Sequence, residues 1–83
     1  MKMNTETALK WIAEVFNESP GGITPETNRE DIPEWDSLGV LTLMADLDEK
    51  FDILLTADQM GAMTKVNDIL EVLQQHQKLS PAN

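Results

Sequence analysis

The sequence predicts an all-α fold, a small bundle of three main helices and one short helix. Apolar residues recur at spacings of three and four in three separate segments, as they do on one face of a helix. No segment of useful length alternates between apolar and polar residues, so nothing indicates a β-sheet. A chain of 83 residues is short enough to form a single domain, residues 1–83, with a simple core.

The first helix is expected from about residue 4 to residue 17. Asn4 or Thr5 can cap its N-terminus, and the run Ser19-Pro20-Gly21-Gly22 stops the helical pattern. Its apolar face consists of Ala8, Leu9, Ile12, Val15 and Phe16. The long polar loop that follows, residues 23–35, is expected to be functional or packed down by its own side chains. The side chains able to hold it are Ile23, Ile32 and Trp35.

The second helix is expected from Ser37 to Phe51, and the last helix starts near Thr64. Between them, Thr56 can cap a short helical turn that Gly61 breaks. The core face of the second helix consists of Val40, Leu43, Met44, Leu47 and Phe51, and that of the last helix of Val66, Ile69, Leu70, Val72 and Leu73. The ordered core should span about residues 4–75, with a frayed tail over residues 76–83.

Charge and composition exclude several classes of function. Fifteen acidic and six basic residues give a net charge of −9, which repels nucleic acid and anionic lipid, so we expect neither partner. No apolar run approaches the roughly 20 residues of a membrane span, and the N-terminal residues lack the apolar stretch of a signal peptide. The absence of cysteine excludes disulfides, thiolate metal sites and cysteine nucleophiles. A cytoplasmic monomer is predicted.

The acidic residues are concentrated in one part of the sequence. Nine of them lie between residues 30 and 58, where Lys50 is the only base. They are Glu30, Asp31, Glu34, Asp36, Asp46, Asp48, Glu49, Asp52 and Asp58. This distribution fits plain solubility, and it also fits a surface that binds partners with basic patches.

Asp36 and Ser37 stand at the junction between the long loop and the second helix. Either can cap the helix, and a serine before an apolar helical run is more commonly a cap than a functional site. If Asp36 caps, the Ser37 hydroxyl is left free and faces outward. A helix N-terminus stabilises negative charge by about 0.3–1 kcal/mol at an exposed site, so a phosphodiester built on Ser37 would lie in a favourable field.

Leu38 and Leu41 lie beside Ser37 but off the core face of the second helix, so they are expected to be exposed. Asp48 and Glu49 follow further along the same helix. An apolar centre with an acidic rim is typical of a docking surface for another protein.

Four stretches of this sequence resemble acyl carrier proteins. Asp36-Ser37-Leu38 resembles the Asp-Ser-Leu signature of that family, and residues 34–39, Glu-Trp-Asp-Ser-Leu-Gly, resemble the variant of specialised stand-alone carriers. Residues 47–53 resemble the family's Leu-Glu-Glu-x-Phe segment, and residues 64–69 its Thr-Val-x-Asp-Ile segment at the start of the last helix. The resemblance covers about residues 32–73.

The resemblance implies a carrier that is not itself an enzyme. Ser37 would receive 4′-phosphopantetheine from coenzyme A through a Mg²⁺-dependent phosphopantetheinyl transferase, with Asp36 and Leu38 beside the attachment point. Acyl groups would then travel as thioesters to partner enzymes of fatty-acid, polyketide or related lipid biosynthesis. Leu41, Asp48 and Glu49 would dock those enzymes through their basic patches. An acyl chain tucked into the interior would meet Val40, Met44, Leu47, Met60, Met63 and Ile69.

Departures from the family pattern favour a dedicated carrier for one pathway. Many fatty-acid carriers have acidic residues where this chain has Gly39 and Thr42, and an acid-rich start of the third helix where it has Leu54-Leu55-Thr56. Residues 51–54, Phe-Asp-Ile-Leu, are reminiscent of D-alanyl carriers. An aminoacyl or D-alanyl carrier therefore remains an alternative, as does an acidic helical interaction module that carries no arm.

Other candidate sites in the sequence are weak. Asp46, Asp48 and Asp52 lack the glycine and terminal glutamate of a calcium loop and fit a solvated helix face better, so no metal site is predicted. His76 stands alone near the C-terminus. Trp35 either anchors the loop or contacts a partner, and the sequence leaves both interpretations open.

Overall fold

The computed structural model describes residues 3–19 and 21–79 of the chain. Its elements are α1 (Thr5–Val15), the 3-10 helix η1 (Arg29–Asp31), α2 (Ser37–Phe51), α3 (Ala57–Gly61) and α4 (Val66–Gln75). No strand occurs among the described residues, so the predicted all-α bundle of three main helices and one short helix is confirmed.

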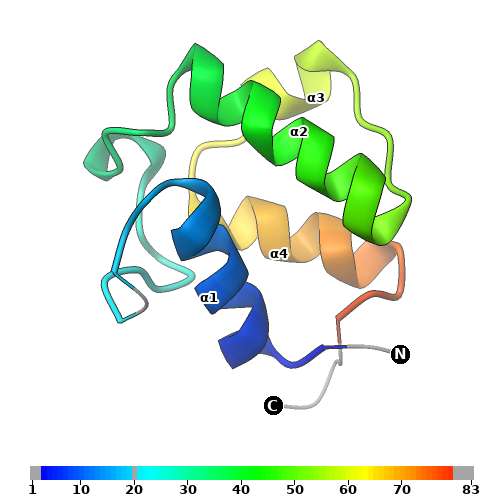
Figure 1. Ribbon diagram of the computed structural model, residues 1–83, viewed down its shortest axis with the longest axis horizontal. Coiled ribbons are helices and arrows are strands. Elements are labelled where there is room, and N and C mark those ends of the chain that lie inside the picture. Colours follow the sequence, from blue (N-terminus) through cyan, green and yellow to red (C-terminus); the bar gives the residue numbers. More distant parts are fainter. Residues whose placement is uncertain (1–2, 20, 80–83) are drawn as a thin grey trace.

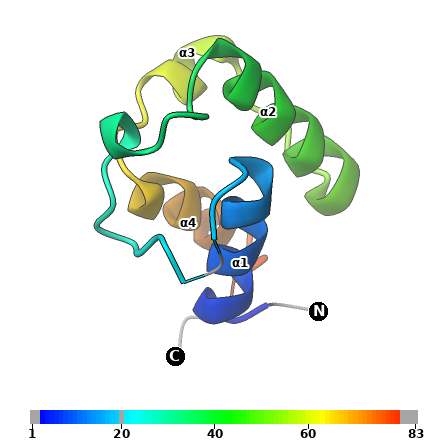
Figure 2. The same ribbon diagram turned by 60° about the vertical axis from the view of Figure 1, so that its left-hand side comes forward.

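The buried side chains of the three long helices belong to one hydrophobic core cluster. Figures 1 and 2 show how these helices are arranged. The loop that joins α1 to α2 wraps around one side of the molecule and contains η1 (Figure 1). Each helix directs its predicted apolar face inward, because residues three and four apart share one side of a helix. The fully buried side chains of these faces are Ala8, Ile12, Phe16, Leu43, Leu47, Val66, Ile69 and Leu73. Partly buried residues of the same faces pack at the edge of the core and include Leu9, Val15, Val40, Met44, Phe51 and Val72.

Side-chain caps begin the helices where the sequence suggested. The Asn4 side chain accepts from the N–H of Thr7 at 2.8 Å, and Asn4 precedes the first residue of α1. Thr56 and Gln59 form a reciprocal capping box at α3. The Asp68 carboxylate accepts from the N–H of Thr64 at 2.7 Å, just before α4 begins. These bonds satisfy donors that have no partner within the helices.

The long helices end alike, with a non-glycine residue in the left-handed region. These residues are Asn17, Asp52 and Gln77, with φ of 60°, 59° and 60°. The next residue then donates back into the helix: Glu18 to the carbonyl of Ala13 at 2.7 Å, Ile53 to Leu47 at 3.0 Å and Lys78 to Leu73 at 2.7 Å. This arrangement satisfies helix carbonyls that would otherwise lack a donor.

The segment after α4 differs from the expected frayed tail. Leu79 is 5% exposed and belongs to the core cluster. Its neighbour Lys78 accepts a backbone hydrogen bond from the N–H of Met3 at 3.1 Å. Residues 76–79 therefore pack back against the N-terminal segment, because an apolar side chain at position 79 reaches the core after the left-handed turn. The rest of that predicted tail, residues 80–83, lies outside the described residues.

Within the described part of the chain, no helix combines the length and the apolar character needed to cross a membrane.

Candidate functional site

The junction between the long loop and α2 carries the serine singled out by the sequence. Asp36 has an extended backbone, and its Oδ1 accepts from the N–H of Gly39 at 3.0 Å. Asp36 is therefore the N-cap, and α2 begins at Ser37. The Ser37 side chain is exposed, and no group in the described part of the chain hydrogen-bonds to its hydroxyl. Of the two capping arrangements that the sequence allowed, the structure has the one that leaves Ser37 free.

Gly39 lets the loop approach the first turn of α2 closely. A Cβ atom added at this position would lie 1.8 Å from the carbonyl oxygen of Glu34 and 3.3 Å from Cε1 of Phe16. A carbon and a backbone oxygen cannot approach so closely, so only glycine fits here without a backbone shift. Gly39 is where many fatty-acid carriers have an acidic residue, and in this chain the packed loop occupies the space that such a side chain would need.

The loop before Ser37 is anchored by buried side chains. Ile23, Ile32 and Trp35 are 4%, 3% and 4% exposed, as the sequence suggested. The Trp35 ring stacks on Phe16 at the end of α1, with 5.0 Å between ring centroids and 15° between the planes. Of the two interpretations of Trp35, the structure supports loop anchoring.

Backbone hydrogen bonds also join the loop to the start of α4. Arg29 donates to the carbonyl of Thr64 at 2.8 Å, Val66 donates to Thr27 at 3.0 Å, and Asn67 donates to Pro25 at 2.9 Å. The two segments are about 40 positions apart in the sequence, so these bonds could not be read from local patterns. They make the loop a fixed support for the junction that carries Ser37.

The proposed docking residues lie on the outer side of α2. Leu38 and Leu41 are 72% and 61% exposed, and Asp48 and Glu49 are also exposed. A third large apolar residue, Leu54, is 81% exposed in the link between α2 and α3, and sequence reasoning did not single it out. The sequence feature that could have indicated its exposure is the run Ile53-Leu54-Leu55 after the end of a helix, because three consecutive side chains cannot all reach the core.

The residues proposed to line an internal acyl site are part of the packed core. Leu47, Met60 and Ile69 are fully buried, and Met63 is 5% exposed. Val40 and Met44 are partly buried and pack against that cluster.

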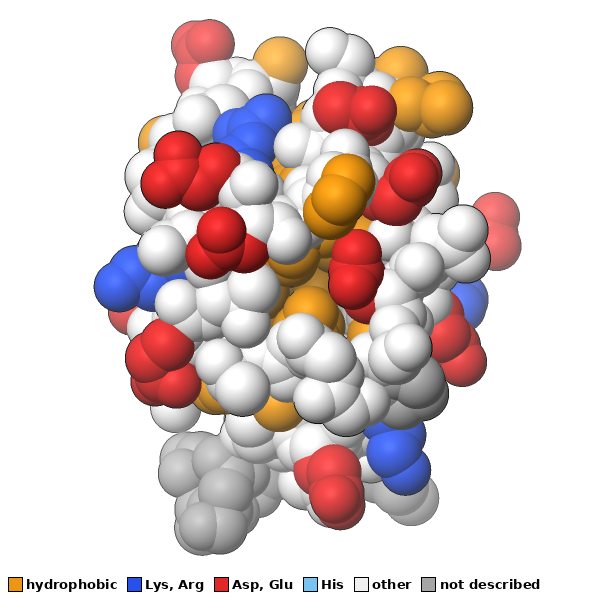
Figure 3. All heavy atoms as spheres, turned by 90° about the vertical axis from the view of Figure 1, so that its left-hand side faces the viewer, with side chains coloured by type: hydrophobic (Ala, Val, Ile, Leu, Met, Phe, Trp, Pro, Cys, Tyr) orange, Lys and Arg blue, Asp and Glu red, His pale blue; other side chains and the backbone are white. Residues whose placement is uncertain are grey.

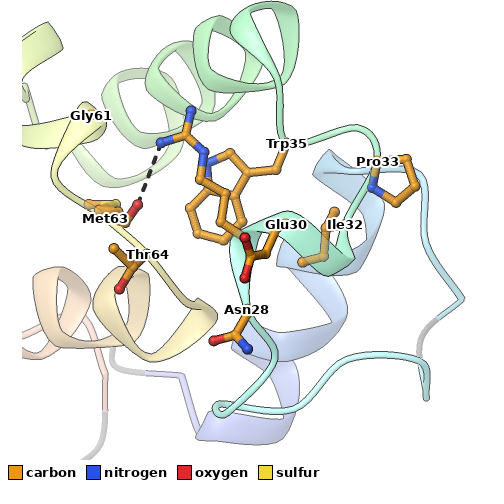
Figure 4. Close-up of a pocket in the computed structure, with 9 residues that line it drawn as sticks. Asn28, Glu30, Ile32, Pro33, Trp35, Gly61, Met63 and Thr64 are labelled. Carbon is orange, nitrogen blue, oxygen red and sulfur yellow. Dashed lines mark hydrogen bonds between the residues drawn. The ribbon is translucent and has the colours of Figure 1, made fainter.

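A cavity of about 620 Å³ opens beside the junction, between the long loop and the link from α3 to α4. Its lining includes Arg29, Trp35 and Met63, and Figure 4 shows the loop residues facing those of the link across it. The Arg29 guanidinium lies over the Trp35 ring, 5.6 Å from the ring centroid. Figure 3 views this side of the molecule, where hydrophobic side chains lie at the bottom of a hollow and acidic side chains surround it. Sequence reasoning did not identify Arg29.

The acidic residues weighed as metal ligands are used differently. Asp46 accepts from Trp11 and pairs with Lys50, whose Nζ lies 3.6 Å from Asp46 Oδ2. In the described ranges, no three histidine or carboxylate side chains gather in a metal-binding arrangement. His76 is exposed just after α4.

No protein-family model matches the sequence, and a search of curated proteins finds no match. The search of solved structures does find similar chains. One is the solution structure of a holo acyl carrier protein from Geobacter metallireducens, with a TM-score of 0.70 and 27% sequence identity over 88% of this chain and 85% of that one. The helical bundle is thus of the carrier type. The chain is an acyl-carrier-like protein, as its sequence motifs predicted.

Proposed function

We propose that this chain carries acyl groups on a 4′-phosphopantetheine arm attached to Ser37. The supporting observation is the free, exposed hydroxyl at the start of α2, where Asp36 already serves as the helix cap. The similarity to a holo acyl carrier protein supports the same function.

The attachment is a phosphoryl transfer from coenzyme A in the active site of a Mg²⁺-dependent phosphopantetheinyl transferase. The Ser37 oxygen attacks the β-phosphorus of coenzyme A, and the bond from that phosphorus to the bridging oxygen breaks. Adenosine 3′,5′-bisphosphate leaves, and the serine proton passes to a base of the transferase. The helix N-terminus stabilises the resulting phosphodiester by about 0.3–1 kcal/mol. Asp36 and Leu38 flank the attachment point and would contact the base of the arm.

The arm, once attached, supplies a thiol that holds acyl groups as thioesters, which a cysteine-free chain cannot do by itself. The chain itself catalyses no step in this proposal. Leu41 provides an apolar contact for partner enzymes, and Asp48 and Glu49 attract the basic patches of enzymes in fatty-acid, polyketide or related lipid biosynthesis. We expect it to act as a monomer in the cytoplasm.

Mass spectrometry of the intact protein tests the attachment. The apo protein is incubated with coenzyme A, Mg²⁺ and a transferase of broad specificity, beside a known carrier as a positive control. The wild-type chain and Ser19→Ala should each gain the mass of one phosphopantetheine group, and Ser37→Ala should gain none. Ser19 is a suitable control because it is also an exposed serine, in the turn after α1.

An unchanged wild-type mass, under conditions that label the control carrier, would overturn the proposal and favour an interaction module without an arm. If only an amino-acid-activating enzyme loaded the holo form, the cargo would be an aminoacyl or D-alanyl group and the proposed acyl cargo would be wrong.

A further inference from the structure

The cavity beside the Ser37 junction combines an apolar wall with Arg29, most of whose N–H donors are free, and with Trp35, whose buried indole N–H has no acceptor among the described residues. Its apolar lining comes from Ile32, Pro33 and Met63. Its volume, about 620 Å³, lies in the range of small-molecule sites. Trp35 also lines it, and two residues of extended chain span at most about 7 Å, so Ser37 is close to its wall.

The first donor is Arg29, the only arginine of the chain. Glu30, Asp31 and Glu34 follow it closely in sequence, yet Arg29 forms no ion pair within the described ranges. Its guanidinium lies over Trp35, and one N–H reaches the carbonyl of Met63 at 3.5 Å, the outer limit of a hydrogen bond (dashed line in Figure 4). A guanidinium has five N–H donors, so most of its capacity remains available.

The second donor is the indole N–H of Trp35. This nitrogen is buried and has no acceptor among the described residues. A buried donor without a partner costs about 1–3 kcal/mol. The other tryptophan, Trp11, donates to Asp46 at 3.0 Å, so the missing acceptor is particular to Trp35.

We propose that this cavity binds the free carboxylate of the carried acyl group, so that the cargo is a dicarboxylic acid joined to the arm through one carboxyl. This inference rests on the proposed function. A carboxylate offers one oxygen to the guanidinium and one to the indole N–H, and arginine is suited to that planar group. The methylene chain would lie along Ile32, Pro33 and Met63. An unsubstituted alkyl end would leave the indole N–H without an acceptor and would give the remaining N–H groups of Arg29 no partner.

Acidic side chains surround the hollow, and Glu30 itself lines the cavity, so these carboxylates oppose the binding of an anion. Glu30 and its neighbours Asp31 and Glu34 are exposed, so solvent and salt weaken that repulsion. Replacing Glu30 with glutamine removes the negative charge and keeps the side-chain size, which should strengthen carboxylate binding.

The test compares three forms of the ¹⁵N-labelled protein in solution. Phosphopantetheinyl transferase attaches the arm from coenzyme A, from pentanoyl-coenzyme A or from 4-carboxybutanoyl-coenzyme A. The two acyl groups differ only at the far end, a methyl group against a carboxylate. Intact mass shows whether each group was attached, so a failure of the proposed function is seen before the cavity is tested.

The readout is the indole N–H signal of each tryptophan. In the 4-carboxybutanoyl form the Trp35 signal should move downfield relative to the other two forms, and the Trp11 signal should stay unchanged as a control for folding. Arg29→Gln should lower the equilibrium constant between bound and free acyl end by about tenfold or more, the loss expected for a hydrogen bond to a charged group. Glu30→Gln should raise it.

Three outcomes would overturn the proposal. Equal shifts with both acyl groups would mean that the cavity binds an alkyl chain. A bare-arm form whose Trp35 signal is shifted from that of the apo protein as far as the signal of the 4-carboxybutanoyl form would assign Arg29 to the phosphodiester. No shift in any form would mean that the cavity binds no cargo.

Discussion

The indole N–H of Trp11 in α1 donates to Oδ2 of Asp46 in α2 over 3.0 Å, joining the two helices. The same tryptophan meets Phe51 edge to face, with 4.9 Å between ring centroids and 78° between planes. Asp46 also pairs with Lys50, but the Lys50 side chain is 52% exposed. The bond to Trp11 should therefore contribute more to stability than the ion pair.

Asp46→Ala should lower the free energy of unfolding by about 1.5–3 kcal/mol, because it leaves the Trp11 indole without its charged acceptor. Lys50→Ala removes only the exposed ion pair and should cost about 0.5 kcal/mol or less. Urea unfolding, followed by circular dichroism, measures both values. Similar losses for the two variants would contradict this assignment.

Gly39→Ala should destabilise the chain by about 1–3 kcal/mol, the usual cost of overpacking, because the added methyl group meets the Glu34 carbonyl. It should also slow phosphopantetheine attachment, since the backbone shift moves the Ser37 junction. Urea unfolding and the rate of mass increase measure these effects.

The matched control is Gly61→Ala, where an added Cβ has no neighbour within 4 Å. This variant should be unchanged in attachment rate and equal to wild type or up to about 1 kcal/mol more stable. If both alanine variants had the same stability and the same attachment rate, the close approach at Gly39 would not matter for folding or for phosphopantetheine attachment.

Reversing Asp48 and Glu49 to lysine should slow association with a partner enzyme severalfold at low salt and leave unfolding nearly unchanged, because exposed charges affect on-rates more than stability. Surface plasmon resonance with the transferase or an acyl-loading enzyme measures the rate. The control reverses Glu14 and Glu26, which are exposed outside α2 and give the same net charge. Equal on-rates for the two double variants would refute the docking surface.

Leu79→Ala should cost about 2 kcal/mol, since this side chain is 5% exposed and belongs to the core cluster. Leu54→Ala, at a residue 81% exposed, should change stability by less than about 0.5 kcal/mol. Thermal and urea unfolding of the two variants provide the comparison. If Leu79→Ala left the free energy of unfolding unchanged, the segment after α4 would not contribute to the core, as the sequence analysis expected of a frayed tail.

The helices were predictable because their signals are local. Helical spacing placed Leu43 and Leu47 in the core, and capping chemistry placed the start of α3 at Thr56 and that of α2 at either Asp36 or Ser37. The exposed position of Leu41 followed from the same helical geometry, whereas that of Ser37 was expected only if Asp36 were the cap.

Non-local features were not predictable. Arg29 joins Met63 and Trp35 in one cavity only because the loop is hydrogen-bonded to the segment before α4. No periodic pattern carries that information. Leu79 was missed because a single apolar residue in a polar stretch gives no periodicity, although it reaches the core after the turn at Gln77.

The three backbone bonds between the loop and α4 also set an order of events during synthesis. Their partners on the C-terminal side are Thr64, Val66 and Asn67. A nascent chain whose residue 67 is still inside the ribosome has no groups to fix that loop. The support beneath Ser37 is therefore completed only after residue 67 has left the ribosome, so the serine reaches its final geometry later than the loop and α2 are themselves made.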